Sequence, residues 1–301
     1  MLMLDRIKRK LDRAWFNFRC AGIYRTPPVK CDSSSNVLIV SQLHHPDLTM
    51  YLLAAKSLAQ YVRPRGFVIV DDGLLPRDKA ILAEHFETIR FLPSASMRLG
   101  TCPHGGCWER LLTLASENTS HYVIQLDSDT LTLAEPSEVL QSIATGRSFT
   151  LGTNSGTHFV SLQEASQRAH ADHDKHVQNH AERALGEYPG MSDLKYVRGC
   201  AGFTGFAPGK LNIPGIEKFS LQMQQLVGMQ KWHEWGSEQV ASNFMVANVD
   251  DSLVLPVERY PFWKPGLDVS KAALIHFFGT FRFMGGMYIR QGMRIIERLS
   301  K

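Results

Sequence analysis

Cysteine and long apolar segments are both scarce in this sequence. Its 301 residues include five cysteines, an odd number that disfavours a disulfide framework and fits a reducing compartment. No apolar run approaches the roughly 20 residues of a membrane-spanning helix, and no signal peptide is visible. We therefore expect a cytoplasmic protein. Cys102 and Cys107 are spaced like half of a zinc site, but no second Cys or His pair follows, so we expect a glycine-rich loop there.

A strong excess of one charge is missing as well. The formal net charge is +4, and the basic residues are dispersed along the chain. This balance disfavours duplex nucleic acid as a partner and suits an anionic small substrate or a membrane surface. With 44% hydrophobic and 21% charged residues, the composition is that of an ordinary globular protein. The absence of repeats and low-complexity linkers favours one continuous domain with a sizeable core.

Strand and helix patterns alternate through the first half of the chain. Short runs rich in β-branched apolar residues predict strands, and the segments between them predict helices. The predicted strands cover residues 36–41, 66–72, 88–92 and 122–126, with helices at 46–61, 76–86 and 108–116. This alternation predicts an α/β, Rossmann-like fold with a mostly parallel sheet and helices on both faces.

The second half is less regular. The segment 163–185 is polar with a helical pattern and few core residues, and a glycine-interrupted strand is expected at 197–207. The other predicted elements are a helix after residue 136, strands at 148–152, 253–257 and 272–277, helices at 216–226 and 238–247, and a basic helix ending at 301.

The most informative stretch is Asp127-Ser128-Asp129, which directly follows the strand predicted at 122–126. Open α/β sheets bind ligands at the carboxyl ends of their strands, so these carboxylates would lie at a binding edge. Two carboxylates held close together are costly unless a cation neutralises them. A divalent metal that bridges a diphosphate explains the pair most economically, and a solvated turn is the alternative.

Acidic residues also end the strand predicted at 66–72. Asp71 and Asp72 should reach the same edge of the sheet, where a carboxylate can accept hydrogen bonds from a nucleotide base or ribose. The alternative is a turn or helix-capping role before Pro76.

A late apolar strand ends in His276, with Gly279 and Arg282 following in the next turn. Imidazole is a common metal ligand, glycine lets the backbone approach a phosphate, and arginine binds phosphate oxygens. On its own, His276 would be interpreted as a core histidine. Together with Asp127 and Asp129 it predicts a mixed carboxylate and imidazole site, which suits manganese better than the alternative, magnesium.

These residues carry a resemblance to a known class of enzyme. The chain resembles glycosyltransferases of the GT-A fold, and most of all glycosyltransferase family eight, the glycogenin-like and bacterial galactosyltransferase group. The closest stretch runs from 108–112 through the Asp-Ser-Asp motif to 136–140. The resemblance implies that Asp127 and Asp129 bind manganese and sugar-nucleotide phosphates, and that Arg110 supports the donor.

Other elements of that family are matched with changes. His276, Gly279 and Arg282 stand where the family has His-x-x-Gly-x-x-Lys, so arginine replaces lysine. The stretch 199–206 lacks the Asn that supports the donor sugar in the family. Glu238 replaces an Asp at a helix start and is the candidate catalytic base near the acceptor hydroxyl. An ordinary acid at a helix N-terminus is the alternative for Glu238.

The resemblance implies a metal-dependent, hexosyltransferase-type enzyme. It would move a sugar from a nucleotide-diphosphate sugar to a glycan or glycolipid acceptor, as in polysaccharide biosynthesis. The domain at 31–301 would then have a nucleotide-binding half at about 36–133 and an acceptor half at about 134–285. One alternative is a sugar-nucleotide nucleotidyltransferase, although the glycine-rich loop typical of that class is missing after the first strand. The second alternative is a non-catalytic protein that binds nucleotide sugars.

Two further segments have alternative interpretations. Four histidines lie in the polar segment, namely His170, His173, His176 and His180. We expect a solvated insert near the acceptor entrance, and a second metal site is the alternative because His176 and His180 are one helical turn apart.

Residues 1–30 form a basic lead-in that begins with an amphipathic helix. The larger apolar side chains of this helix share one face, namely Leu4, Ile7, Leu11, Trp15 and Phe18. We favour a helix packed on the domain with its charges in water. The alternative is a peripheral helix at the inner face of a membrane, which would suit a lipid-linked acceptor.

Overall fold

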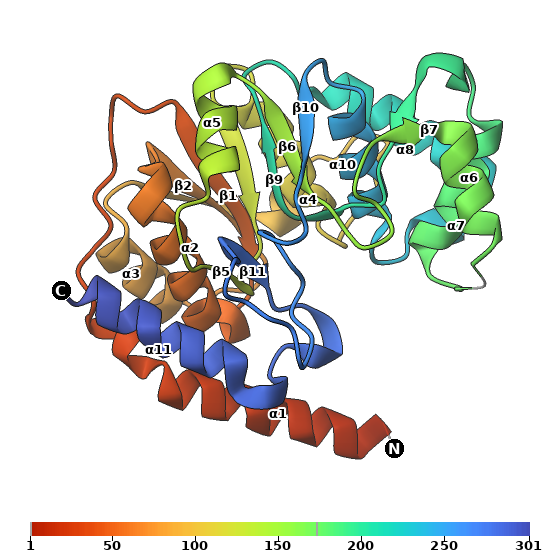
Figure 1. Cartoon of the computed structure of the whole chain (residues 1–301). Coiled ribbons are helices and arrows are strands. Elements are labelled where there is room, and N and C mark those ends of the chain that lie inside the picture. Colours follow the sequence, from red (N-terminus) through yellow and green to blue (C-terminus); the bar gives the residue numbers. More distant parts are fainter. Residues whose placement is uncertain (1, 173) are drawn as a thin grey trace.

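A seven-stranded mixed sheet forms the centre of the structure. The structure is a computed structural model that describes residues 2–172 and 174–301, with side chains from residue 7 onward. Across the sheet the strands are ordered β10, β6, β9, β4, β1, β2 and β3 (Figure 1). Their bounds are Val37–Leu43 for β1, Gly66–Asp71 for β2, Ile89–Pro93 for β3, Tyr122–Leu126 for β4, Ser148–Leu151 for β6, Cys200–Phe206 for β9 and Ser252–Leu255 for β10.

Most neighbouring strands of this sheet are parallel, as predicted. β1 pairs in parallel with β2 and β4, β2 with β3, and β6 with β10. The exception is β9, which runs antiparallel to both β4 and β6. The apolar pattern that predicts this strand carries no information on its direction. Gly205 of β9 lies against the ring of Phe149 on β6, where a side chain would not fit.

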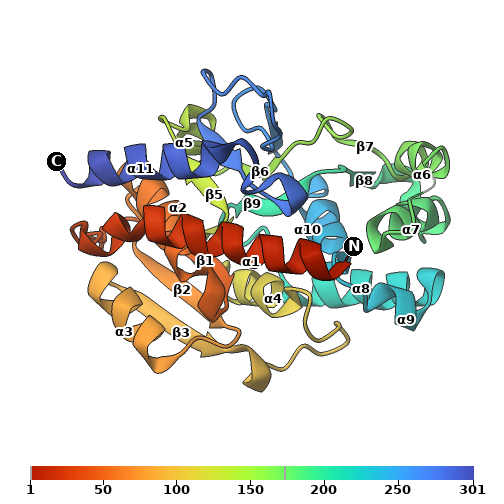
Figure 2. The ribbon, with the colours of Figure 1, turned by 90° about the horizontal axis from the view of Figure 1, so that it is seen from below.

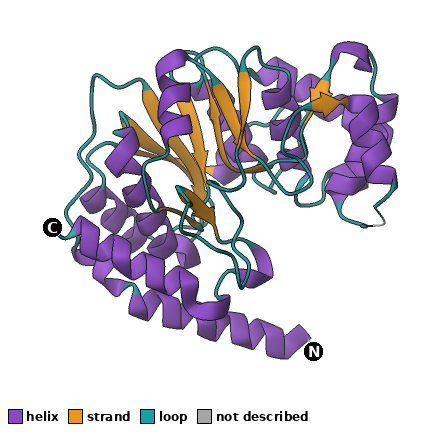
Figure 3. Ribbon diagram, viewed as in Figure 1, coloured by secondary structure: helices purple, strands orange, loops and turns teal. Residues whose placement is uncertain are grey.

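Helices cover both faces of the sheet (Figure 3). Alternate strand residues point to opposite faces, so Ile39 of β1 joins one buried cluster and Val40 joins the other. The first cluster contains residues of α2 (Leu48–Val62), α3 (Pro76–His85), α5 (Ser137–Thr145) and α11 (Met287–Leu299), and the second those of α4 (Trp108–Glu117), α8 (Ile213–Val227), α9 (Met229–Trp232) and α10 (Ser237–Ala247).

A small antiparallel ribbon lies next to the carboxyl end of β4 (Figure 1). It consists of β5 (Thr130–Thr132) and β11 (Leu274–His276), and its register pairs His276 with Thr130. Because Thr130 directly follows Asp129, this pairing brings His276 to the Asp-Ser-Asp turn.

The polar segment 163–185 forms two helices instead of one, α6 (Leu162–His170) and α7 (Val177–Ala184). A short ribbon of β7 (Val160–Ser161) and β8 (Lys195–Tyr196) lies beside them. The expectation of a solvated insert is wrong for one side of these helices, because Val177, Ala181 and Leu185 are fully buried. α7 packs against α6, α8 and α10, which covers its apolar side.

The terminal helices α1 (Leu2–Arg19) and α11 contact each other on the underside of the domain (Figures 1 and 2). α1 packs inward through Phe16, whose ring centroid lies 4.3 Å from that of Tyr288. The face that we expected to pack on the domain is instead exposed: Trp15 is 52% exposed and Phe18 71%. That expectation is wrong because a different side of the helix carries the packing residue. None of the described helices is both long and apolar enough to cross a bilayer.

Candidate active site

The Asp-Ser-Asp motif forms a tight turn between β4 and β5. The backbone N–H of Asp127 donates to the carbonyl of Gly202 on β9 (2.8 Å), and the Thr130 hydroxyl donates to the Asp127 carbonyl (2.9 Å). The carbonyl of Asp129 accepts from the N–H of Phe277, just after β11 (2.8 Å). Three elements therefore fix the backbone of the turn, and both carboxylates project from the carboxyl end of a central strand.

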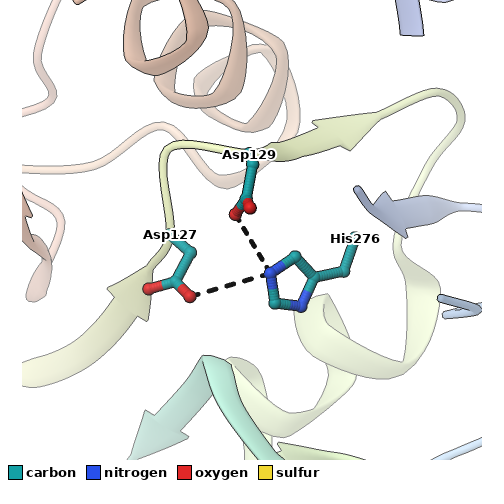
Figure 4. A group of neighbouring side chains, drawn as sticks. All are labelled: Asp127, Asp129 and His276. Atoms are coloured by element: carbon teal, nitrogen blue, oxygen red, sulfur yellow. Dashed lines mark hydrogen bonds and ion pairs between the residues drawn. The ribbon is translucent and has the colours of Figure 1, made fainter. Parts of the chain in front are cut away.

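His276 meets both carboxylates of this turn (Figure 4). Its Nε2 lies 3.0 Å from Asp129 Oδ1 and 3.7 Å from Asp127 Oδ2. One ligand atom from each of the three residues lies within 4.8 Å of the others. The expected convergence of these groups is confirmed, whereas metal binding stays a prediction. Asp129 and His276 are buried and Asp127 is half-buried, so the cluster is accessible from the Asp127 side.

Two arginines neutralise the carboxylates. Nη2 of Arg282 lies 2.5 Å from Asp129 Oδ2, and Arg110 of α4 pairs with Asp127. Burial opposes ionisation of Asp129, but the neighbouring His276 and Arg282 outweigh it and lower the pKa of Asp129 to about 2. Burial would likewise lower the pKa of His276, yet Asp129 raises it well above its ordinary value. Without a metal, the cluster is therefore an ion network of two carboxylates, an imidazolium and two guanidiniums.

The donor set fits a divalent metal. Two carboxylates and an imidazole are ligands that manganese accepts, and a metal would replace the proton on His276. Gly202 of β9 leaves room beside them, because a Cβ at this position would lie 2.8 Å from Asp127 Oδ2 and 2.9 Å from His276 Nδ1. Gly202 was not predicted as a site residue, although a glycine inside a strand often marks such a close approach.

Cys200 is a second residue at the cluster that was not predicted from the sequence. Its Sγ lies 3.6 Å from His276 Nδ1, on the side of the ring away from Asp129. A contact at the second ring nitrogen orients a metal-binding histidine. The glycine-interrupted pattern of 197–207 and the resemblance over 199–206 both pointed to this segment, but neither distinguished Cys200 from its neighbours.

Glu238, the candidate base, is buried at the start of α10 with 4% exposure. Burial outweighs the attraction of Arg110 and raises the pKa of Glu238 to about 7. Its Oε1 has no hydrogen-bond partner among the described residues and lies 3.6 Å from Arg110 Nη2. This environment differs from that of an ordinary solvated acid at a helix terminus. The catalytic role of Glu238 stays a prediction.

The two acids after β2 differ in their surroundings. Asp71 Oδ1 accepts from the backbone N–H groups of Gly73 (3.1 Å) and Leu74 (2.8 Å), and its Oδ2 lies 2.5 Å from Lys79 Nζ. These contacts give Asp71 the turn-forming role that was the alternative for this pair. Asp72 is exposed at the sheet edge and accepts from the side chains of Gln42 (3.2 Å) and Ser94 (3.5 Å). Of the two, Asp72 is therefore the one open to a nucleotide.

The histidines of 170–182 do not gather into a metal site within the described part of the chain. His170 and His180 are exposed. His176 caps α7, since its Nδ1 accepts from the N–H of Gln178 (3.2 Å). His173 lies outside the described residues. Cys102 and Cys107 are free thiols.

No protein family model and no curated protein sequence matches the chain. Among solved structures, an active-site mutant of LgtC has a TM-score of 0.50 at 12% identity, covering 88% of this chain and 96% of that one. The galactosyltransferase LgtC with donor and acceptor sugar analogues has a TM-score of 0.48 at 12% identity, with the same coverage of 88% and 96%. The apo bifunctional glycosyltransferase WbbM has a TM-score of 0.47 at 12% identity over 90% of this chain and 53% of its own. This chain thus spans about half the length of WbbM.

The likeness to the LgtC mutant extends over most of both chains and shows the fold. The chain has the GT-A fold, as the resemblance implied. Membership of family eight stays a prediction.

Proposed function

We propose that this chain is a metal-dependent glycosyltransferase that moves a sugar from a nucleotide-diphosphate sugar to a glycan or glycolipid acceptor. One observation carries the proposal: Asp127, Asp129 and His276 converge at the carboxyl edge of a central strand in a GT-A fold. That edge is where open α/β sheets bind ligands. The cluster also has a mixed set of carboxylate and imidazole donors that manganese accepts.

A divalent metal, manganese by preference, would be held by Asp127, Asp129 and His276. When bound, it would neutralise charge on the departing nucleoside diphosphate. The chain itself would contribute fixed positive charge at the same place through Arg110 and Arg282. Arg282 also donates from Nε to the carbonyl of Phe277 (2.9 Å), which holds its guanidinium at the cluster.

A basic cleft of about 840 Å³ leads away from Arg282, between α1 and the loop 279–284. Four more basic side chains line it together with one acidic residue, Asp12; the basic ones are Lys8, Arg9, Lys10 and Arg13. Such a concentration of positive charge attracts phosphate groups. Gly279 also lines this cleft, with a positive φ of 66° that suits glycine. These contacts support roles for Gly279 and Arg282 in binding the donor diphosphate.

Glu238 is proposed as the carboxylate that faces the reacting sugar. A carboxyl group with a pKa of about 7 can hold or release a proton near neutral pH, as a general base requires. Its partner Arg110 also pairs with Asp127, which connects this carboxylate to the metal ligands. Asp72 is proposed to contact the base or ribose of the nucleotide.

The ion pairs favour one second candidate, a non-catalytic nucleotide-sugar binding protein. Arg110 and Arg282 already neutralise both carboxylates, so the cluster is stable without a metal. A metal-dependent enzyme would turn over a sugar nucleotide in the presence of the metal, whereas a binding protein would not turn it over at all.

The test is hydrolysis and transfer with a panel of sugar nucleotides, with manganese or with a chelator. Asp129→Asn should abolish turnover, and its matched control is Asp250→Asn, because the Asp250 side chain is 99% exposed. The Asp129 variant should remain folded but unfold at a lower temperature, since His276 and Arg282 lose their buried partner. Turnover that equals the control in this variant, or that is insensitive to the chelator, would contradict the proposal.

A further inference from the structure

Helix α1 presents an apolar stripe to solvent. Ile7, Leu11, Trp15 and Phe18 are 46%, 64%, 52% and 71% exposed. At about 100° per residue, these four positions span roughly 80° of the helix circumference. Phe16, which packs on Tyr288, lies on the opposite side. The side chain of Leu4, which the helical pattern assigns to the same stripe, lies outside the described residues.

Basic side chains flank this stripe on both sides. By the same helical geometry, Lys8 and Arg19 lie along one edge and Lys10 along the other. All three are exposed, and Lys8 and Lys10 also reach the lining of the basic cleft beside Arg282. The Arg19 guanidinium lies 5.4 Å from the Trp15 ring centroid, and the Trp15 and Phe18 rings stack at 5.7 Å. An apolar stripe with aromatic rings between rows of cations is typical of helices that lie in a membrane interface.

We propose that the outer face of α1 docks on a lipid bilayer that contains anionic lipids. The apolar side chains would enter the interface, while Lys8, Lys10 and Arg19 would contact lipid headgroups. Figure 2 shows α1 extending across the underside of the domain, with its outer side free of other elements. The whole stripe is therefore accessible to a flat surface.

A second copy of this chain suits the stripe less well. The exposed surface of these four side chains amounts to roughly 500 Å². Two copies in contact would thus bury about 1,000 Å², less than the roughly 1,200 Å² of a stable interface. The flanking cations would also repel one another in such a dimer, whereas an anionic surface attracts them.

Docking would also orient the candidate active site. The inner side of α1 contributes Arg9 and Arg13 to the basic cleft that contains Arg282. Bilayer contact on the outer side would therefore hold this cleft close to the lipid surface. This arrangement would suit a lipid-linked acceptor. That implication rests on the proposed function, whereas the docking of α1 on a bilayer is independent of it.

The test is co-sedimentation of the full-length chain with vesicles of phosphatidylcholine, with and without phosphatidylglycerol. The wild type should bind the anionic vesicles, and binding should weaken with salt. The Leu11→Glu, Phe18→Glu double variant should bind at least about tenfold more weakly. Its matched control is Leu221→Glu, Met229→Glu, which changes two exposed apolar residues on α8 and α9 (45% and 64% exposed) and should bind like the wild type.

Brominated lipids provide a second measurement that needs no added charge. They should quench the fluorescence of the wild type, and Trp15→Phe should remove most of that quenching. A wild type that stays in the supernatant, or a Leu11→Glu, Phe18→Glu variant that binds equally, would overturn the proposal. A dimer in light scattering that the double variant converts to a monomer would assign the stripe to self-association instead. None of these readouts depends on glycosyl transfer.

Discussion

Nη2 of Arg110 lies 3.6 Å from Oε1 of Glu238, and both side chains are buried. The other terminal nitrogen of Arg110 pairs with Asp127. One guanidinium on α4 thus connects Glu238, the second residue of α10, with the turn after β4. The carboxylate proposed as a base and a carboxylate proposed as a metal ligand share this cation, so a change at one should affect the other.

The first prediction concerns pH and Glu238. The pKa of this carboxyl group is raised from 4.5 to about 7 by burial. Between these values the folded state keeps a proton that the unfolded state releases, so stability falls as pH rises through this window. The loss should reach up to about 3 kcal/mol above pH 7. Glu238→Gln should remove this dependence, so thermal unfolding of the two proteins should diverge at pH 8 and agree at pH 4.5. Parallel curves would contradict the raised pKa.

The second prediction separates Asp71 from Asp72. Asp71→Ala should lower stability by about 1–2 kcal/mol, because two backbone N–H groups lose their acceptor. Asp72→Ala should leave stability within about 0.5 kcal/mol and raise the donor KM more than it lowers kcat, since the contact is shared by ground and transition states. Unfolding curves and steady-state kinetics on both variants decide the matter. A kcat effect alone for Asp72→Ala would contradict its role.

The third prediction concerns Gly202. A methyl group here would press on Asp127 and His276, so Gly202→Ala should cost about 1–3 kcal/mol in stability. It should also weaken manganese binding, measured by titration at a temperature where the variant is fully folded. Wild-type affinity for manganese in this variant would show that the cluster is not the metal site.

The fourth prediction tests how α1 packs. Phe16→Ala should destabilise the protein by about 3–5 kcal/mol, because its ring is fully buried against Tyr288. Trp15→Ala, one residue away, should change stability by less than about 0.5 kcal/mol, because this ring faces solvent. Chemical denaturation of the two variants measures both values. Similar losses would mean that α1 packs through its apolar stripe.

Much of the fold was predictable because strand and helix periods are local properties. The strand at 122–126 and the helix start at Pro76 agree with β4 and α3. Convergence of Asp127 with His276 was expected from strand ends that meet at one sheet edge, but in the structure it arises because β11 pairs with β5 in a separate ribbon. The direction of β9 was not predictable, because buried and exposed side chains alternate in the same way in a parallel and in an antiparallel strand. The positions of Gly202 and Cys200 at the cluster depend on that direction.

The orientation of α1 was unpredictable for a related reason. A helical pattern identifies an apolar stripe, but it does not say which side of the helix meets the domain. One buried ring, Phe16, outweighs four partly exposed side chains because it fits between the residues of α11 and the loop before it. Arg110 and Glu238 likewise meet only through the packing of α4 and α10, which no local pattern describes.

The most direct test of the account is calorimetric titration of the wild type and His276→Gln with a panel of sugar nucleotides, each with and without manganese. The account predicts that the wild type binds one of them at one site per chain, and that manganese tightens binding at least about tenfold. The His276 variant should lose this gain and remain folded by circular dichroism. Equal affinity with and without manganese, or no binding of any sugar nucleotide by the folded wild type, would contradict the central claim that Asp127, Asp129 and His276 hold a metal for a nucleotide-sugar donor.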